Sequence, residues 1–229
     1  MIKRIVVFIF LTLLLIGCSS NVEENVDIKI VKNMLLKFNE HNIDITIHPQ
    51  RKVVFFVDRV KVNISDQDNK YSGAVILNSN MNLHSTYVNG KNQMVRLVTA
   101  YTPEYFGKKI TDKQLNKINK SGNVYEIEIQ KMSDDKQITT LKFKYALKLD
   151  EEIDGISIED NSFSFNFDNF IYPDNLDNNI PLTINVRAPK RFDISFNNKS
   201  GQVQEMEFMK KTTFTLESLP SASVLKGQG

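Results

Sequence analysis

Cys18 is the only cysteine in the 229-residue chain, and the segment before it has the composition of an export signal. Lys3-Arg4 provides a basic start, and an apolar run covers residues 5–16. The run leads into Leu15-Ile16-Gly17-Cys18. This is the pattern of a bacterial lipobox, in which a small residue precedes a cysteine that receives lipid on its thiol. The expected chemistry at Cys18 is therefore acylation, with Leu15, Ile16 and Gly17 recognised by the signal peptidase.

The same apolar run could instead be a transmembrane anchor, but residues 5–16 are too few for that role. Spanning ~30 Å of hydrocarbon takes ~20 residues. We therefore expect residues 1–17 to be removed as a lipoprotein signal peptide and residues 18–24 to form a polar tether. More than one acyl chain on Cys18 would hold the protein on the extracytoplasmic face of a bacterial membrane, which is the cell membrane, or the outer membrane if the cell has two.

No residue pattern in the chain predicts catalysis. The histidines, His41, His48 and His84, are scattered, and the sequence contains no HExxH, GxSxG, Walker or GxGxxG motif. Acidic residues cluster at 150–154 and 174–179, where a solvated loop is the simpler interpretation and a cation site the alternative. The sequence thus predicts no catalytic residue, no metal ligand and no cofactor, and we expect a protein that is not an enzyme.

The charge balance limits the class of partner. The chain has 29 Lys and Arg residues against 27 Asp and Glu residues, a net charge of +2. Lys3 and Arg4 account for this surplus, so the mature chain is expected to be nearly neutral. Nucleic-acid binding requires a basic surface, so no nucleic-acid partner is expected. Neutrality also argues against a strong electrostatic contact with anionic lipid.

Two helices are predicted. The first is an amphipathic helix over residues 25–41, because apolar residues recur there at helical spacing. The second is a short inserted helix that begins with a capping box at Thr111-Asp112-Lys113-Gln114, presents Leu115 and Ile118 to the core, and ends at Ser121-Gly122.

Residues 42–217 alternate between apolar and polar with a period of two, which is typical of strands. Residues 53–57 are apolar at every position, so this strand is expected to be covered on both faces. Asn89-Gly90 predicts a tight hairpin. We expect an all-β fold, an antiparallel sandwich or pair of saddle-shaped sheets, followed by a flexible tail at 218–229.

A further hairpin is predicted between residues 125–132 and 138–149. In one register Glu126 faces Lys144 and Glu128 faces Lys142, while the apolar residues of both strands face each other on the other side.

Several segments resemble the amino-terminal β-domain of the zinc aminopeptidases related to aminopeptidase N and the leukotriene hydrolases. They are Ile43-Asp44-Ile45-Thr46-Ile47-His48-Pro49, Phe170-Ile171-Tyr172-Pro173, Val186-Arg187-Ala188-Pro189, and Thr213-Phe214-Thr215-Leu216-Glu217-Ser218-Leu219-Pro220. The resemblance covers residues 42–225 and implies the β-domain of that family without its catalytic domain. The family's HExxH has no counterpart here, so no site residue is transferred.

These observations leave three functions open. The favoured one is a membrane-anchored, non-catalytic binding or scaffold module of the cell envelope, with a protein partner whose identity the sequence does not give. The second is the amino-terminal part of a split or truncated zinc metallopeptidase. The third is a lipoprotein that carries a lipid or another ligand in the cleft between its sheets.

Overall fold

The computed structural model describes residues 34–63, 70–106, 110–130, 138–149, 153, 155–176, 179–220 and 222–229. These described residues pack as one unit. The predicted signal peptide and tether, residues 1–24, lie outside the described residues. Among the described residues, no helix combines the length and apolar character that a membrane crossing requires.

The largest element is an eight-stranded sheet with the strand order β15-β16-β12-β2-β3-β9-β5-β6. Its neighbouring strands are antiparallel except for β2 and β12, which are parallel. The strands are β2 (Phe38–His48), β3 (Val53–Asn63), β5 (Asn82–Val88), β6 (Lys91–Gln93), β9 (Ile138–Lys148), β12 (Leu182–Pro189), β15 (Gln202–Glu205) and β16 (Met209–Leu216).

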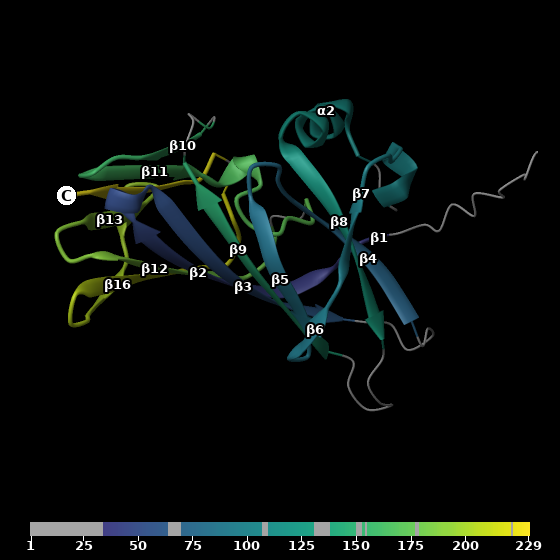
Figure 1. Cartoon of the computed structure of the whole chain (residues 1–229), viewed down its shortest axis with the longest axis horizontal. Helices are drawn as coiled ribbons and strands as arrows, with labels where there is room; N and C mark the ends of the chain where they lie inside the picture. Colours follow the sequence, from purple (N-terminus) through teal and green to yellow (C-terminus); the bar gives the residue numbers. More distant parts are fainter. Residues whose placement is uncertain are drawn as a thin grey trace, which may run out of the picture. The chain divides into compact units, whose positions relative to one another are not determined.

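Two smaller sheets pack with it (Figure 1). One has the order β10-β11-β17-β13-β14 and the other the order β1-β4-β8-β7. Their strands are β10 (Ile156–Ile158), β11 (Ser162–Asn166), β17 (Val224–Gln228), β13 (Asp193–Phe196), β14 (Lys199–Ser200), β1 (Met34–Leu35), β4 (Lys70–Asn78), β8 (Gly122–Gln130) and β7 (Val95–Val98). The remaining elements are α2 (Asp112–Ser121) and the 3-10 turns η1 (Pro49–Arg51), η2 (Pro103–Phe106) and η3 (Phe167–Asn169). The predicted all-β fold is confirmed.

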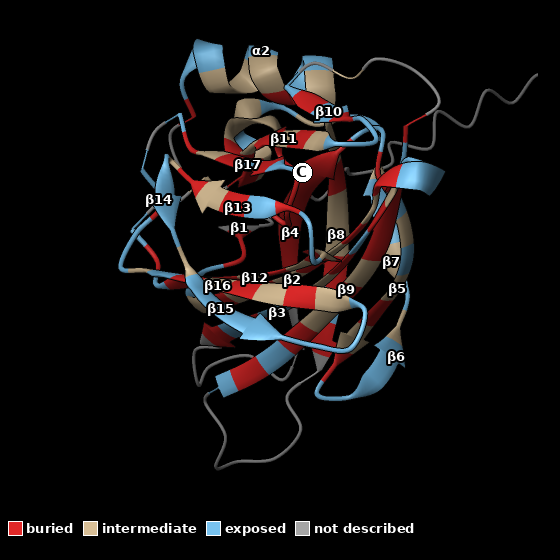
Figure 2. Cartoon of the chain, turned by 90° about the vertical axis from the view of Figure 1, so that its left-hand side faces the viewer, coloured by how far each residue is buried: buried red, intermediate tan, exposed pale blue. Residues whose placement is uncertain are grey.

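One continuous apolar core joins all three sheets. Alternate residues of the large sheet point into it, which Figure 2 shows as buried and less buried positions alternating along the strands. Phe56 of β3 stacks on Tyr145 of β9 at 4.8 Å between ring centroids and meets the edge of Phe165 from β11 at 6.4 Å. Such aromatic pairs stabilise a core beyond the area they bury.

Two local predictions are confirmed. Asn89 and Gly90 adopt φ angles of 48° and 82° between β5 and β6, where Val88 pairs with Lys91. Two central residues at positive φ form the turn whose twist matches a two-residue hairpin. The capping box at Thr111 is also present, with Gln114 accepting from the Thr111 amide at 3.0 Å.

The helix predicted over 25–41 is wrong in the part that the structure describes. Residues 34–35 form β1, which pairs with Gly73 and Ala74, and residues from Phe38 onward form β2. A bulge between Phe38 and Glu40 inserts an extra residue, so that Phe38 and His41 are both buried. The bulge gives the strand a spacing of three, which in sequence looks like a helix turn. Residues 25–33 lie outside the described residues.

The predicted hairpin between residues 125–132 and 138–149 is also wrong. β8 pairs with β4 and β7, whereas β9 pairs with β3 and β5. An alternating strand fits any antiparallel partner with the same alternation. Glu126 forms an ion pair with Arg96, and not with Lys144 as the predicted hairpin required.

The tail predicted to be flexible, residues 218–229, contains a central strand instead. β17 lies between β11 and β13 and pairs with both. Leu225 is completely buried. A Cβ atom on Gly227 would lie 2.1 Å from the Phe163 ring, so the small residue that suggested a loose chain allows a close contact.

This arrangement predicts that Leu225→Ala lowers the free energy of unfolding by about 2–5 kcal/mol, the usual cost of a large cavity in a core. Urea denaturation measures the change. Lys226→Ala is the matched control, because Lys226 is exposed on the same strand, and it should change stability by less than about 0.5 kcal/mol. Equal stabilities for the two variants would contradict a structural role for β17.

Candidate functional site

The predicted lipidation site lies outside the described residues. Cys18 and the recognition residues Leu15, Ile16 and Gly17 therefore remain predictions.

The three histidines are not brought together. His41 is buried, His84 is exposed, and the His48 ring packs edge-on against Phe55 at 5.8 Å. In the part of the chain that the structure describes, no group of three His, Cys, Asp or Glu residues could hold a metal ion.

The candidate cation loop after residue 173 has a structural role in its described part. Asp174 accepts a hydrogen bond from the Leu176 amide at 2.6 Å, and Asn175 donates to the Leu36 carbonyl at 2.9 Å. Both side chains are buried. Asp174 closes a turn within the loop, and Asn175 holds the loop against the segment between β1 and β2. Of the acidic run 150–154, only residue 153 is described.

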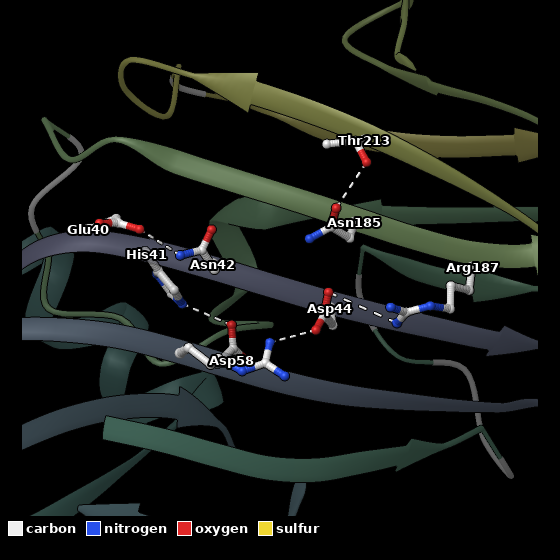
Figure 3. A network of polar contacts seen from close by, with 9 residues as sticks. Glu40, His41, Asn42, Asp44, Asp58, Asn185, Arg187 and Thr213 are labelled. Atoms are coloured by element: carbon white, nitrogen blue, oxygen red, sulfur yellow. Dashed lines mark hydrogen bonds and ion pairs between the residues drawn. The ribbon is translucent and has the colours of Figure 1, made fainter. Parts of the chain in front are cut away.

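Asp58 is a buried carboxylate in the middle of the large sheet, at an inward position between Phe56 and Val60. Nε2 of His41 lies 2.8 Å from its Oδ1, as Figure 3 shows. Its Oδ2 accepts from the Tyr145 hydroxyl, which also lies 3.1 Å from the Ile171 carbonyl oxygen. The group thus connects β2, β3 and β9 to the segment that follows η3.

Burial raises the pKa of Asp58, although the hydrogen bonds from His41 and Tyr145 oppose the shift. Asp58, His41 and Tyr145 are each at most 3% exposed, so a substrate cannot reach them and we assign the group to stability. The signal that could have found it is an acidic residue at an inward position of an amphipathic strand, which the sequence contains.

The outer face is our name for the side of the eight-stranded sheet that points away from the core. Glu40, Asn42 and Asp44 of β2 lie on it, beside Asn185 and Arg187 of β12 and Thr213 of β16 (Figure 3). Thr46, which pairs with Arg187, lies on it as well. On β3, β9 and β5 it carries Phe55, Val57, Arg59, Lys61, Lys142, Lys144, Lys148, Ser85 and Tyr87. None of these side chains is fully buried, so the outer face is open to solvent.

Short polar contacts join neighbouring strands on the outer face. Arg59 donates to Asp44 at 2.6 Å, and Lys61 donates to Glu40 at 2.5 Å. Thr213 donates to Asn185 at 2.9 Å. Exposed ion pairs of this kind contribute little to stability, so the chemistry of the face lies in its hydrogen-bonding groups and charge.

Phe55 contradicts the prediction that residues 53–57 are covered on both faces. Its side chain remains 47% exposed on the outer face, next to His48. Val53 and Val57, on the same face, are partly buried. The fully apolar sequence of this strand therefore places an aromatic group at the surface.

A separate cleft of about 430 Å³ lies between the free edges of two sheets, at β14 and β15. Its apolar floor includes Phe196 and Phe214, and Lys199, Gln202 and Thr215 contribute polar groups to its walls. The volume suits a small ligand. This is the feature nearest to the ligand-carrying alternative.

No protein-family model and no curated protein matches the sequence. Solved structures do match. An M1 zinc metallopeptidase from Deinococcus radiodurans aligns with a TM-score of 0.53 and 14% identity, over 85% of this chain and 42% of that chain. The chain thus has the fold of one part of this peptidase. Legionella pneumophila aminopeptidase A aligns with a TM-score of 0.57 and 11% identity, over 86% of this chain and 22% of that chain.

Yeast LTA4 hydrolase gives a similar result, with a TM-score of 0.53 and 7% identity over 85% of this chain and 28% of that chain. The chain thus spans less than half the length of each of these structures. The agreement confirms the predicted resemblance in fold and is consistent with a match to the amino-terminal β-domain alone. We call the folded part of this chain the M1-like β-domain.

The raised pKa of Asp58 predicts a pH-dependent stability. A carboxyl group whose pKa rises on folding from an ordinary value of 3.8 adds stability at low pH, and that contribution is lost as the pH climbs through the folded-state pKa. The stability of the natural chain relative to Asp58→Asn should therefore decline as the pH rises above about 4. Urea denaturation at several pH values measures the difference.

Tyr145→Phe provides the second arm of this test. It removes a hydrogen bond that lowers the pKa of Asp58. With this substitution the pKa of Asp58 is therefore higher, and the decline in stability should extend to a higher pH. A stability difference that does not vary with pH would contradict the assignment.

Proposed function

We propose that this chain is a non-catalytic binding module of the bacterial envelope, anchored through lipid on Cys18, whose M1-like β-domain presents the outer face to a partner. The observation that carries the proposal is Phe55, an exposed aromatic side chain on an open sheet face that is otherwise rich in polar groups. Aromatic residues are enriched in the centres of interfaces.

The fold supports a binding role in a second way. The buried His41 and Asp58 of the large sheet bond to each other, whereas the polar side chains of the outer face are accessible to a partner. A rigid sheet holds such side chains in fixed positions at little entropic cost on binding. The lipobox supports the anchor, because it accounts for the position of the chain's single cysteine.

The second candidate function is part of a zinc metallopeptidase, in which another polypeptide supplies the catalytic residues. It is favoured by the alignment, which covers 84–86% of this chain but only 22–42% of the matched peptidase chains. In that case the M1-like β-domain would pack against a domain that contains HExxH.

Site-specific crosslinking tests the proposal and separates the two candidates. A photoreactive phenylalanine analogue at position 55 should crosslink to a partner in intact cells, whereas the same analogue at Phe208, which is 78% exposed on the loop before β16, serves as the control. Mass spectrometry then identifies the crosslinked partner. A partner that contains HExxH would support the peptidase candidate, and the absence of any crosslink at position 55 would contradict a binding role for the outer face.

The anchor has a test of its own. Cys18→Ser should abolish labelling of the chain by palmitate and leave its signal peptide uncleaved. Metabolic labelling and the size of the chain on a gel measure the two effects. Palmitate incorporation that persists in Cys18→Ser would show that the lipid lies elsewhere.

A further inference from the structure

The charge of the outer face differs from that of the chain as a whole. Acidic residues are nearly as numerous as basic ones in the full sequence, at 27 against 29. On the outer face the basic side chains outnumber the acidic Glu40 and Asp44. The basic residues there are Arg59, Lys61, Lys142, Lys144, Lys148, Arg187 and Lys211. The fold has therefore separated charge that the composition balances.

Lys142 and Lys144 form the least neutralised part of this face. The predicted hairpin paired them with Glu128 and Glu126, but both carboxylates belong to β8 in another sheet. Neither lysine forms an ion pair with a described residue. Each instead lies over the ring of Tyr87, at 5.7 Å for Lys142 and 5.2 Å for Lys144.

Arg59 brings another basic side chain to the same place, where Asp44 is its ion-pair partner. Arg59 pairs directly with Lys142 across β3 and β9, and Lys61 lies two residues further along β3. Like charges directly opposite each other destabilise a sheet. A hydrogen bond with Ser85 and, after it, the charge of Lys144 lower the pKa of Tyr87. An arrangement that costs stability is typical of a binding site.

We infer that this part of the outer face, formed by Arg59, Lys61, Lys142, Lys144 and Tyr87, binds a linear polyanion of the cell envelope. The inference rests on the proposed function and names its partner class. Residues two apart on a strand are ~6.8 Å apart and neighbouring strands ~4.8 Å. Lys142 and Lys144 on β9 and Arg59 and Lys61 on β3 therefore form two short parallel rows of positive charge.

Two basic side chains of the face already form ion pairs with carboxylates of the chain itself. Asp44 and Glu40 sit one strand away from the rows and hold Arg59 and Lys61 at 2.6 and 2.5 Å. A polyanion would extend the same contact to Lys142 and Lys144. We favour a flexible polymer over a bilayer because neighbouring strands rotate by about 20–25°, so that a chain can follow the rows while a plane touches only some of them.

Binding of inorganic polyphosphate to the full chain in non-ionic detergent tests the inference. The logarithm of the affinity should fall linearly with the logarithm of salt concentration, because bound phosphates release counterions. K142Q/K144Q should weaken binding about tenfold or more at low salt and reduce the salt slope by about two. K113Q/K226Q is the matched control, because both residues are exposed on other elements, α2 and β17, and it should bind as the natural chain does.

Three outcomes would overturn the inference: no binding of polyphosphate, an equal loss in both double variants, or binding only to vesicles that contain phosphatidylglycerol. The last would reassign the face to a membrane surface. Crosslinking from position 55 in a chain that, with Lys142 and Lys144 intact, binds no polyphosphate would leave the proposed function standing and reject only this partner class.

A single variant separates binding from folding. K142E replaces the like-charge pair with Arg59 by an ion pair, so it should raise the melting temperature by about 1–3 °C. The same variant should bind polyphosphate more weakly than K142Q does. A melting temperature that falls would contradict the charge conflict between Arg59 and Lys142.

Discussion

The parallel pairing of β2 with β12 is the contact on which the large sheet depends. It runs from Leu182 opposite His41 to Arg187 opposite Thr46 and joins segments far apart in the sequence. On one side of this seam lie β3, β9, β5 and β6, and on the other β16 and β15. Because the side-chain period of a strand is two, the same register fixes both surfaces at once. Ile43, Ile45 and Ile184 meet inside, while Asp44, Asn185 and Arg187 meet outside.

Local sequence was enough to predict features that depend on neighbouring residues. The turn at Asn89-Gly90 and the capping box at Thr111 were predicted correctly because positive φ and short-range hydrogen bonds decide them. Strand partners were not, because alternation alone is shared by every amphipathic strand. The bulge at Phe38 and the pairing of β17 with β11 and β13 depend on contacts that no short window of sequence contains.

The candidate site shows the same division. Asp58 could have been found, since an acidic residue at an inward position signals a buried polar group that needs partners. The charge of the outer face could not, because it depends on which strands lie beside β9. With β8 as neighbour, Lys142 and Lys144 would have been neutralised. With β3 as neighbour they lie beside Arg59 and Lys61, whose carboxylate partners are Asp44 and Glu40, so the change of partner leaves Lys142 and Lys144 without a carboxylate among the described residues.

The place of β17 bears on when this protein can fold. β11 and β13 do not pair with each other and are joined only through residues 224–228. The five-stranded sheet can therefore close only after that segment has been synthesised, and the parallel seam also waits for residue 182 and beyond. Topologies rich in such distant contacts fold slowly. For the exported lipoprotein that we propose, this delay is an advantage, because translocation requires an unfolded polypeptide. The order of the strands keeps the five-stranded sheet open until residues 224–228 have been made.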